Sequence, residues 1–140
     1  MSVVRLFVDS SAFFAVLDRG DEDHRRATAI LSGENRLITT DHVLVESWRL
    51  ARQRLGRNVA ERFWGAVRGG QATVETVLPS DLDAARRIGE LFADQDFSIV
   101  DRTSFAVMER LGISSVATFD DHFAIYRYGP RRERAFDVRR

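Results

Sequence analysis

Short apolar runs alternate with longer segments of helical spacing along the whole chain. Residues 3–8 form a nearly continuous apolar run, broken only by an arginine, which is typical of a strand covered on both faces. Residues 36–40, 72–79 and 114–119 have further strand patterns, and a weaker one lies near 135–138. These segments predict the strands of one sheet.

Between these strands, apolar residues recur at the spacing of amphipathic helices. A short helix is predicted directly after the first strand, and further helices are predicted over residues 21–34, 41–56, 58–68, 80–95 and 98–112. Gly33 and Gly56 are expected to end two of them, and Ser80 to cap a third. Strands that alternate with helices predict an α/β three-layer sandwich with a mainly parallel central sheet.

Composition favours one small globular domain over residues 1–140. The chain has 140 residues, 44% of them hydrophobic, which is enough for one sizeable core. No apolar run approaches the roughly 20 residues that span a bilayer, and no signal-type segment opens the chain. We therefore expect a cytoplasmic protein with no membrane association. Because there is no cysteine, any metal must be held by oxygen or imidazole ligands.

Basic charge comes from arginine alone and is unevenly distributed. All 21 basic residues are arginines, so a lysine nucleophile, a Schiff base and a Walker-type phosphate loop are excluded. Residues 127–140 contain six arginines and two acids, a net charge of +4, while the whole chain has a net charge of zero. The rest of the chain is therefore acidic, with a net charge of −4.

Carboxylates follow two of the predicted strands directly. Asp9 comes after the first strand, and Asp120 and Asp121 come after the strand at 114–119. Because the carboxyl ends of parallel strands meet at one edge of a sheet, where ligands bind in such folds, these acids are expected to lie together. The alternative is that each aspartate only caps the helix that follows it.

Two further acids lie at predicted helical positions. Glu46 is in line with Val43 and Leu50, on the apolar stripe of its helix, where a carboxylate needs a partner. The carboxylate either belongs to a metal site, pairs with a buried arginine, or reaches past the apolar surface to solvent. Asp101 begins the helix over 98–112, where it is either a simple cap or a fourth acid that faces the same sheet edge.

Four converging carboxylates would require a shared proton or a divalent cation. With oxygen ligands and no thiolate, Mg²⁺ or Mn²⁺ is the expected ion. Such an ion activates water and stabilises charge on a phosphate, which points to hydrolysis of phosphodiester bonds.

Other catalytic arrangements fit the sequence less well. Ser10 and Ser11 adjoin Asp9, but no Gly-x-Ser-x-Gly elbow surrounds them. A haloacid-dehalogenase motif needs an aspartate at position 11, where this chain has serine. His122 follows the second acidic strand end and is a candidate for a phosphate contact.

The chain resembles the PIN-domain family and, within that family, the VapC toxins of bacterial toxin–antitoxin systems. The matching segments are LFVDSSAFFAVLD, LITTDHVLVESW, SIVDRTSFAVMERLGI and VATFDDHF, which together span residues 5–123 in the order of the family. The last of them contains the pattern Thr118-x-Asp-x-x-Phe123. Asp121 fits this pattern less well and is assigned to the first turn of the next helix.

The resemblance implies a Mg²⁺- or Mn²⁺-dependent endoribonuclease that a cognate VapB-like antitoxin inhibits. Asp9, Glu46, Asp101 and Asp120 match the four acids of the family. Asp9 and Asp101 are expected to contact the metal directly, whereas Glu46 and Asp120 act through water. A homodimer is the family expectation.

Some alternatives remain open from sequence. Trp48 and Phe63 belong either to an antitoxin-binding groove or to the core, and the arginine-rich tail either contacts RNA phosphates or is only a solvated final strand. The same fold also serves in RNA processing without an antitoxin, or as a non-catalytic interaction module.

Overall fold

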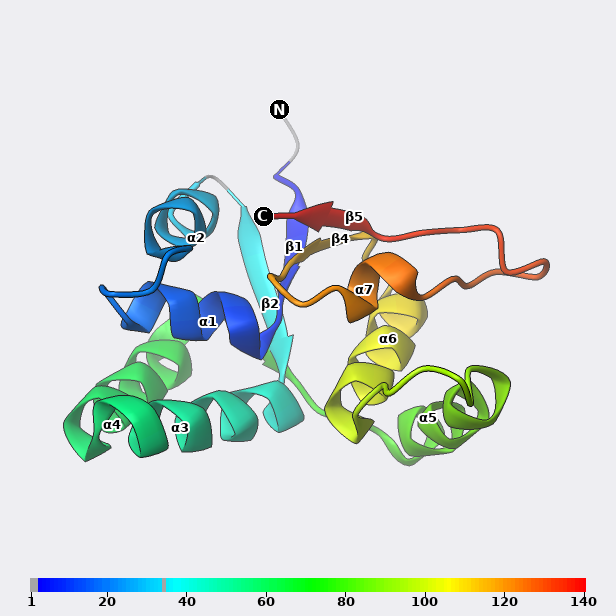
Figure 1. Cartoon of the computed structure of the whole chain (residues 1–140), viewed down its shortest axis with the longest axis horizontal. Coiled ribbons are helices and arrows are strands. Elements are labelled where there is room, and N and C mark those ends of the chain that lie inside the picture. The colour runs from blue at the N-terminus through cyan, green and yellow to red at the C-terminus, as the bar shows by residue number, and fades with distance from the viewer. Residues whose placement is uncertain (1–2, 34) are drawn as a thin grey trace.

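Residues 3–33 and 35–140 are described by the computed structural model, and their centre is a five-stranded sheet (Figure 1). All neighbouring strands are parallel, in the order β3-β2-β1-β4-β5. The strands are β1 (Arg5–Val8), β2 (Arg36–Thr40), β3 (Thr73–Glu75), β4 (Ser115–Ala117) and β5 (Asp137–Arg139). The predicted α/β sandwich with a parallel sheet is therefore confirmed.

Helices cover both faces of this sheet. The first group, on the left in Figure 1, consists of α1 (Ser10–Leu17), α2 (His24–Leu31), α3 (Asp41–Leu55) and α4 (Arg57–Ala66), which a π-helical turn (Val67–Gln71) extends. The second group, on the right, consists of α5 (Pro79–Leu91), α6 (Ile99–Leu111) and α7 (His122–Ile125). Among the helices of the described residues, none is long and apolar enough to cross a membrane.

The core lies on both sides of the central strand. Leu6, Phe7 and Val8 of β1 have no exposed surface, which explains why that segment reads as a continuous apolar run. Beneath α6 and α7, the ring of Phe105 stacks on Tyr126 and meets Phe123 edge-on, with centroids 4.2 and 4.9 Å apart. Such aromatic contacts add to the free energy gained from burial.

Several helix starts differ from the prediction by one to three residues. The helix expected at Ser80 begins at Pro79, because proline has the fixed φ and the missing N–H that suit a first helical position. Leu78 takes the cap position, and its N–H donates to Asp81. The strand before this helix, which was predicted to extend to residue 79, ends at Glu75.

The helix predicted over 21–34 is shorter at both ends. Asp21 accepts a hydrogen bond from the N–H of Asp23 (2.8 Å), a local turn that delays the helix until His24. The helix ends at Leu31, just before Gly33, and Glu34 lies outside the described residues.

The direction of strand addition reverses beside β1. The chain runs from β1 outward through β2 to β3, and then crosses the sheet to β4 and β5 on the other side of β1. The carboxyl ends of β1 and β4 therefore lie next to each other at the switch point, where ligands bind in open α/β sheets. The amide of Asp9 even continues the pairing by donating to Ala117 O (3.1 Å).

Candidate active site

Asp9 leaves the sheet at the end of β1 and is 4% exposed. It occupies the cap position of α1, yet its side chain makes no capping hydrogen bond. Its Oδ2 instead accepts hydrogen bonds from Thr118 Oγ1 (2.9 Å) and Ser11 Oγ (3.0 Å). Burial raises the pKa of this carboxyl group to about 6 despite those bonds, and the charge of Asp101 contributes to the increase.

Glu46 points from α3 toward the same place. Its Oε1 accepts a hydrogen bond from Ser10 Oγ (3.1 Å), at the first residue of α1. Its buried Oε2 has no hydrogen-bond partner among the described residues. Burial raises the pKa of Glu46, and the charges of Asp101 and Asp120 raise it further. The carboxylate on the apolar stripe therefore has a hydroxyl partner and an unpaired oxygen, without a hydrogen-bonded arginine.

Asp101 is fixed at the start of α6 by a capping box. The cap residue is Ser98, and not Asp101 as the simple capping alternative supposed. Asp101 Oδ2 accepts from the N–H of Ser98 (3.0 Å), and the N–H of Asp101 donates to Ser98 Oγ (3.0 Å). The same Oδ2 lies 2.7 Å from Nδ1 of His122. Asp101 is 7% exposed, and both of these contacts are made by the same carboxylate oxygen.

Asp120 and His122 complete the site on the loop after β4. Asp120 Oδ1 accepts from the N–H of His122 (2.8 Å) and lies 3.4 Å from its Nδ1. Burial lowers the pKa of His122, but the hydrogen bond with Asp101 and the charge of Asp120 outweigh this effect and raise it. Asp121, which was assigned to the first turn of the next helix, takes the cap position directly before α7.

The four predicted acids therefore approach one another but do not form one equally tight group. Asp101, Asp120 and His122 each offer a ligand atom within 4.8 Å of the other two, a spacing that a single metal ion can fill. Asp9 and Glu46 are linked to this group through the field of Asp101, which raises the pKa of both. Their nearest fixed partners are hydroxyl groups.

Sequence reasoning missed three of the side chains that hold these carboxylates. Thr118 and Ser11 bind Asp9, and Ser11 Oγ also accepts from the N–H of Phe119 (2.9 Å). His122 was considered for a phosphate contact, but its contact with Asp101 was not predicted. The threonine two residues before Asp120 was the available signal, because it belongs to the same short pattern.

The donor set suits a hard divalent cation. It consists of carboxylate oxygens and one imidazole, with no thiolate. The unpaired buried Glu46 Oε2 and the raised pKa of Asp9 are the expected signs of a site that lacks part of its compensating positive charge. An acidic site of this kind, at the switch point of a parallel sheet, has the ligand chemistry that metal-dependent phosphodiester hydrolysis requires.

The PIN domain family model matches residues 6–127. This match includes all four acids and their hydroxyl partners. The chain therefore belongs to the PIN-domain family, whose nucleases use a divalent metal ion.

The same relationship appears in whole-chain comparisons. The 23S rRNA-specific endonuclease VapC20 of Mycobacterium tuberculosis strains CDC 1551 and H37Rv is 32% identical over 123 residues, or 85% of this chain and 92% of the relative. The crystal structure of M. tuberculosis VapC20, described as a sarcin–ricin loop cleaving toxin, matches with a TM-score of 0.81 and 30% identity, over 86% of this chain and 93% of that one. By this homology the chain is a VapC-type ribonuclease toxin.

Proposed function

We propose that the chain is a Mg²⁺- or Mn²⁺-dependent endoribonuclease whose site consists of Asp9, Glu46, Asp101 and Asp120. The observation that carries the proposal is the partly unpaired carboxylate cluster at the switch point, in which Glu46 Oε2 is buried without a hydrogen-bond partner among the described residues. Within this site, Asp101 and Asp9 are the proposed direct ligands. A bound divalent cation would supply Lewis acidity toward water and toward the phosphate oxygens.

The chain's own groups have distinct proposed tasks. Thr118 and Ser11 hold Asp9 Oδ2, which leaves its other oxygen for the cation. Ser98 and His122 hold Asp101 Oδ2 in the same way. The raised pKa and free Oε2 of Glu46 suit it to accept a proton from the attacking water.

The proposed substrate is a loop of large-subunit ribosomal RNA. The support is the specificity named for VapC20, at 32% identity over most of both chains. Because such RNA is cytoplasmic, we place the activity in the cytoplasm.

Cleavage of intact ribosomes and of a sarcin–ricin hairpin tests this function. Purified toxin, freed of antitoxin, is incubated with Mg²⁺, with Mn²⁺ or with EDTA. We expect one main cut that needs the metal and is lost in Asp9→Asn. Asp121→Asn is the matched control, because Asp121 follows Asp120 directly and, among the described residues, its side chain forms an ion pair with Arg140 alone, at the surface. Activity in EDTA, or in Asp9→Asn, would contradict the proposal, and complete inactivity of folded protein would favour a non-catalytic module.

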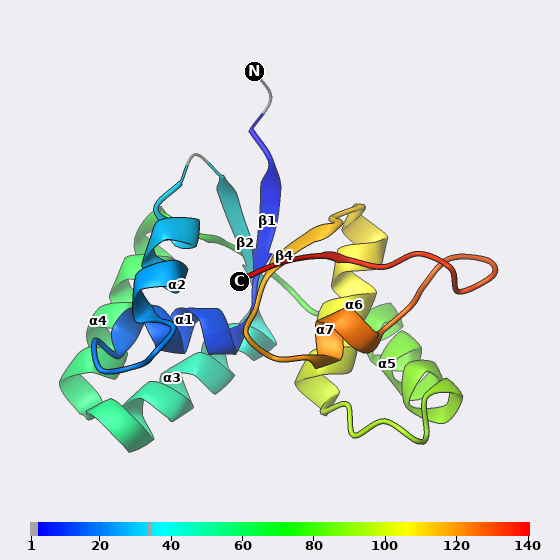
Figure 2. The ribbon, with the colours of Figure 1, turned by 45° about the horizontal axis from the view of Figure 1, so that its top comes forward.

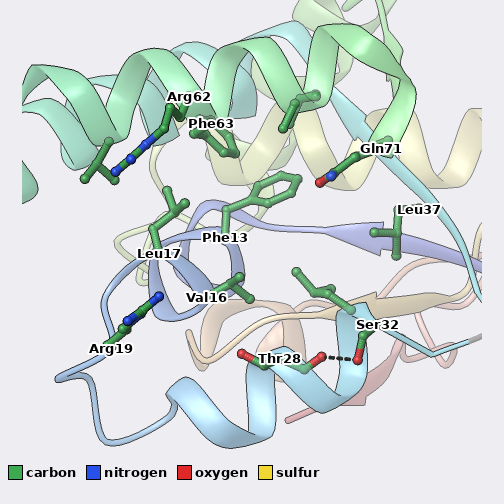
Figure 3. A pocket seen from close by; sticks show the side chains of 15 residues that line it. Phe13, Val16, Leu17, Arg19, Thr28, Ser32, Leu37, Arg62, Phe63 and Gln71 are labelled. Carbon is green, nitrogen blue, oxygen red and sulfur yellow. Dashed lines mark hydrogen bonds between the residues drawn. The ribbon is translucent and has the colours of Figure 1, made fainter.

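We also propose that the cognate antitoxin occupies an apolar groove between α1, α2 and α4. The groove has a volume of about 670 Å³ (Figure 3). Phe13, Leu17 and Phe63 line it, and Arg19 and Arg62 add positive charge. An amphipathic helix with acidic flanks matches this lining. Of the two residues that the sequence left open between a groove and the core, Phe63 belongs to the buried core and also lines this groove, whereas Trp48 is not part of the lining.

Two charge substitutions distinguish this groove from the surface around Trp48. Val16 lines the groove, while Val45 adjoins Trp48 and Trp64 in a separate hollow. We expect Val16→Glu to release the antitoxin in co-purification and Val45→Glu to retain it. The opposite pattern would move the antitoxin to the Trp48 surface. If neither substitution releases an antitoxin, and the gene has no antitoxin gene beside it in its operon, the result would favour an RNase that processes RNA without an antitoxin.

A homodimer remains part of the proposal. Val45, Leu82 and Ile99 are large apolar residues that are about half exposed, which is compatible with a second copy covering some of them. Light scattering that shows only monomer, with and without antitoxin, would contradict it.

A further inference from the structure

The C-terminal segment, residues 127–140, is a basic arm attached to the edge of an acidic body. It has a net charge of +4, whereas the rest of the chain has −4. Arg131, Arg132 and Arg134 are exposed, and in the described part of the chain none of their guanidinium groups takes part in a salt bridge. The acidic body and the acidic site repel a polyanion. Exposed positive charge on this segment therefore has a large effect on how tightly a polyanion binds to the protein.

A turn closed by backbone hydrogen bonds carries these arginines. Tyr128 and Arg134 exchange backbone hydrogen bonds of 3.0 and 3.1 Å in an antiparallel bridge. Gly129 has φ = +92°, and a Cβ there would lie 3.2 Å from Arg134, so the turn needs glycine. Arg132 has φ = +51°, a conformation that costs free energy for a residue other than glycine. The Tyr128 ring stacks on the buried Phe136 at 4.8 Å, which anchors the turn to the core.

The arm is continuous with the rim of the active site. Arg139 pairs with Ala117 across β4 and β5, and its carbonyl accepts from the N–H of Thr118 (3.3 Å). Arg140 pairs with Asp121 at 2.8 Å. Figure 2 shows the segment running from the end of β4 outward past α7 to the projecting turn. A nucleic acid that enters the site would therefore have the arm on one side.

We propose that the turn formed by residues 128–134 binds RNA phosphates at a distance from the cleaved bond, on the part of the RNA that extends past α7, through Arg131, Arg132 and Arg134. This inference rests on the proposed RNase function and assigns the arm to substrate binding, separate from the chemistry at Asp9. Phosphate contacts position the RNA without reading its sequence. The contribution of the arm is therefore the same for any stem of similar shape.

Salt-dependent RNA binding tests the arm independently of cleavage. All proteins contain Asp9→Asn so that the RNA stays intact, and fluorescence anisotropy follows a labelled sarcin–ricin hairpin and a hairpin of unrelated sequence. The arm variant is Arg131→Gln/Arg132→Gln/Arg134→Gln. The matched control is Arg68→Gln/Arg86→Gln/Arg87→Gln, which removes three exposed arginines elsewhere. Thermal unfolding confirms that both variants are folded.

We expect the arm variant to lose at least about ten-fold in affinity for both hairpins at 0.1 M salt. The slope of log affinity against log salt should fall by about 3, or about 1 for each phosphate contact. The control should change much less. Equal losses in the two variants would overturn the proposal, as would unchanged binding by the arm variant. Weakened antitoxin binding with unchanged RNA binding would also overturn it and assign the arm to the protein partner. Because wild-type cleavage is measured separately, failure of the nuclease proposal remains distinguishable.

Discussion

Asp9 and Asp81 are both almost fully buried, yet their carboxylates are compensated in opposite ways. Asp81 is 2% exposed and receives two charged hydrogen bonds from Arg110, at 2.9 and 3.0 Å, and one from the N–H of Leu78. Burial alone would raise the pKa of Asp81, but the Arg110 contacts lower it. Among the described residues, the side chains that donate to Asp9 are the hydroxyl groups of Ser11 and Thr118, and the pKa of Asp9 rises to about 6.

The difference separates a structural carboxylate from a functional one. The Asp81–Arg110 pair joins α5 to α6 and stabilises the ionised acid within the folded chain. Ionised Asp9 lowers the stability of the fold and is kept beside three more acids. A protein gains from such an arrangement only if something outside the chain supplies the missing positive charge.

The largest expected effect on stability is a gain in Asp9→Asn without metal. In EDTA at pH 7.5 we expect about 3 kcal/mol of added stability in urea unfolding, since the pKa is raised from 3.8 to about 6. An acid with a raised pKa stabilises the fold most fully below its unfolded pKa, and this contribution is lost as the pH rises through about 6. The gain should therefore vanish below pH 4. A destabilised Asp9→Asn protein at pH 7.5 would break the comparison.

Arg110→Ala should act in the opposite direction. It leaves Asp81 buried with only the Leu78 N–H, so we expect a loss of about 2 kcal/mol. Because the pKa of Asp81 is lowered, the wild-type pair stabilises the fold above the unfolded pKa, and this contribution is lost as the pH falls through the folded one. The difference between wild type and variant should shrink in acid. Urea unfolding from pH 2 to 7 measures it, and a pH-independent difference would contradict the assignment.

His122→Ala should weaken metal binding by about ten-fold without unfolding the protein. Asp101 Oδ2 would keep only the Ser98 N–H, so the carboxylate would be less firmly oriented. Calorimetric titration with Mn²⁺ measures the affinity, and partial recovery in His122→Asn would support a role as hydrogen-bond donor. Unchanged affinity in His122→Ala would limit the histidine to contacts outside the metal site.

The smallest expected effect is that of Arg86→Ala. Arg86 and Glu90 form an exposed pair on α5, with 85% and 66% of their side-chain surface accessible. Exposed ion pairs four residues apart on a helix contribute about 0.3–0.5 kcal/mol. A loss comparable to that of Arg110→Ala, measured in the same urea unfolding series, would show that burial does not explain the strength of the Asp81 pair.

The predictable features were those that local patterns specify. Asp9 and Asp120 follow strands, and Glu46 interrupts an apolar stripe, so their convergence followed from sheet geometry. The contact of Thr118 with Asp9 could not be predicted in the same way. It joins residues 109 positions apart in the sequence and depends on the register of β1 against β4. The start of α5 was missed because proline and serine compete as start signals at adjacent positions.

The most direct test of the central claim is a Mn²⁺ titration followed by calorimetry, with wild type, Asp9→Asn and Asp121→Asn. The claim is that the buried acids around Asp9 are retained to bind a divalent cation. We expect saturable binding by wild type and Asp121→Asn, and at least about a hundred-fold weaker binding by Asp9→Asn. Equal affinity in all three proteins, or no binding by folded wild type, would contradict it.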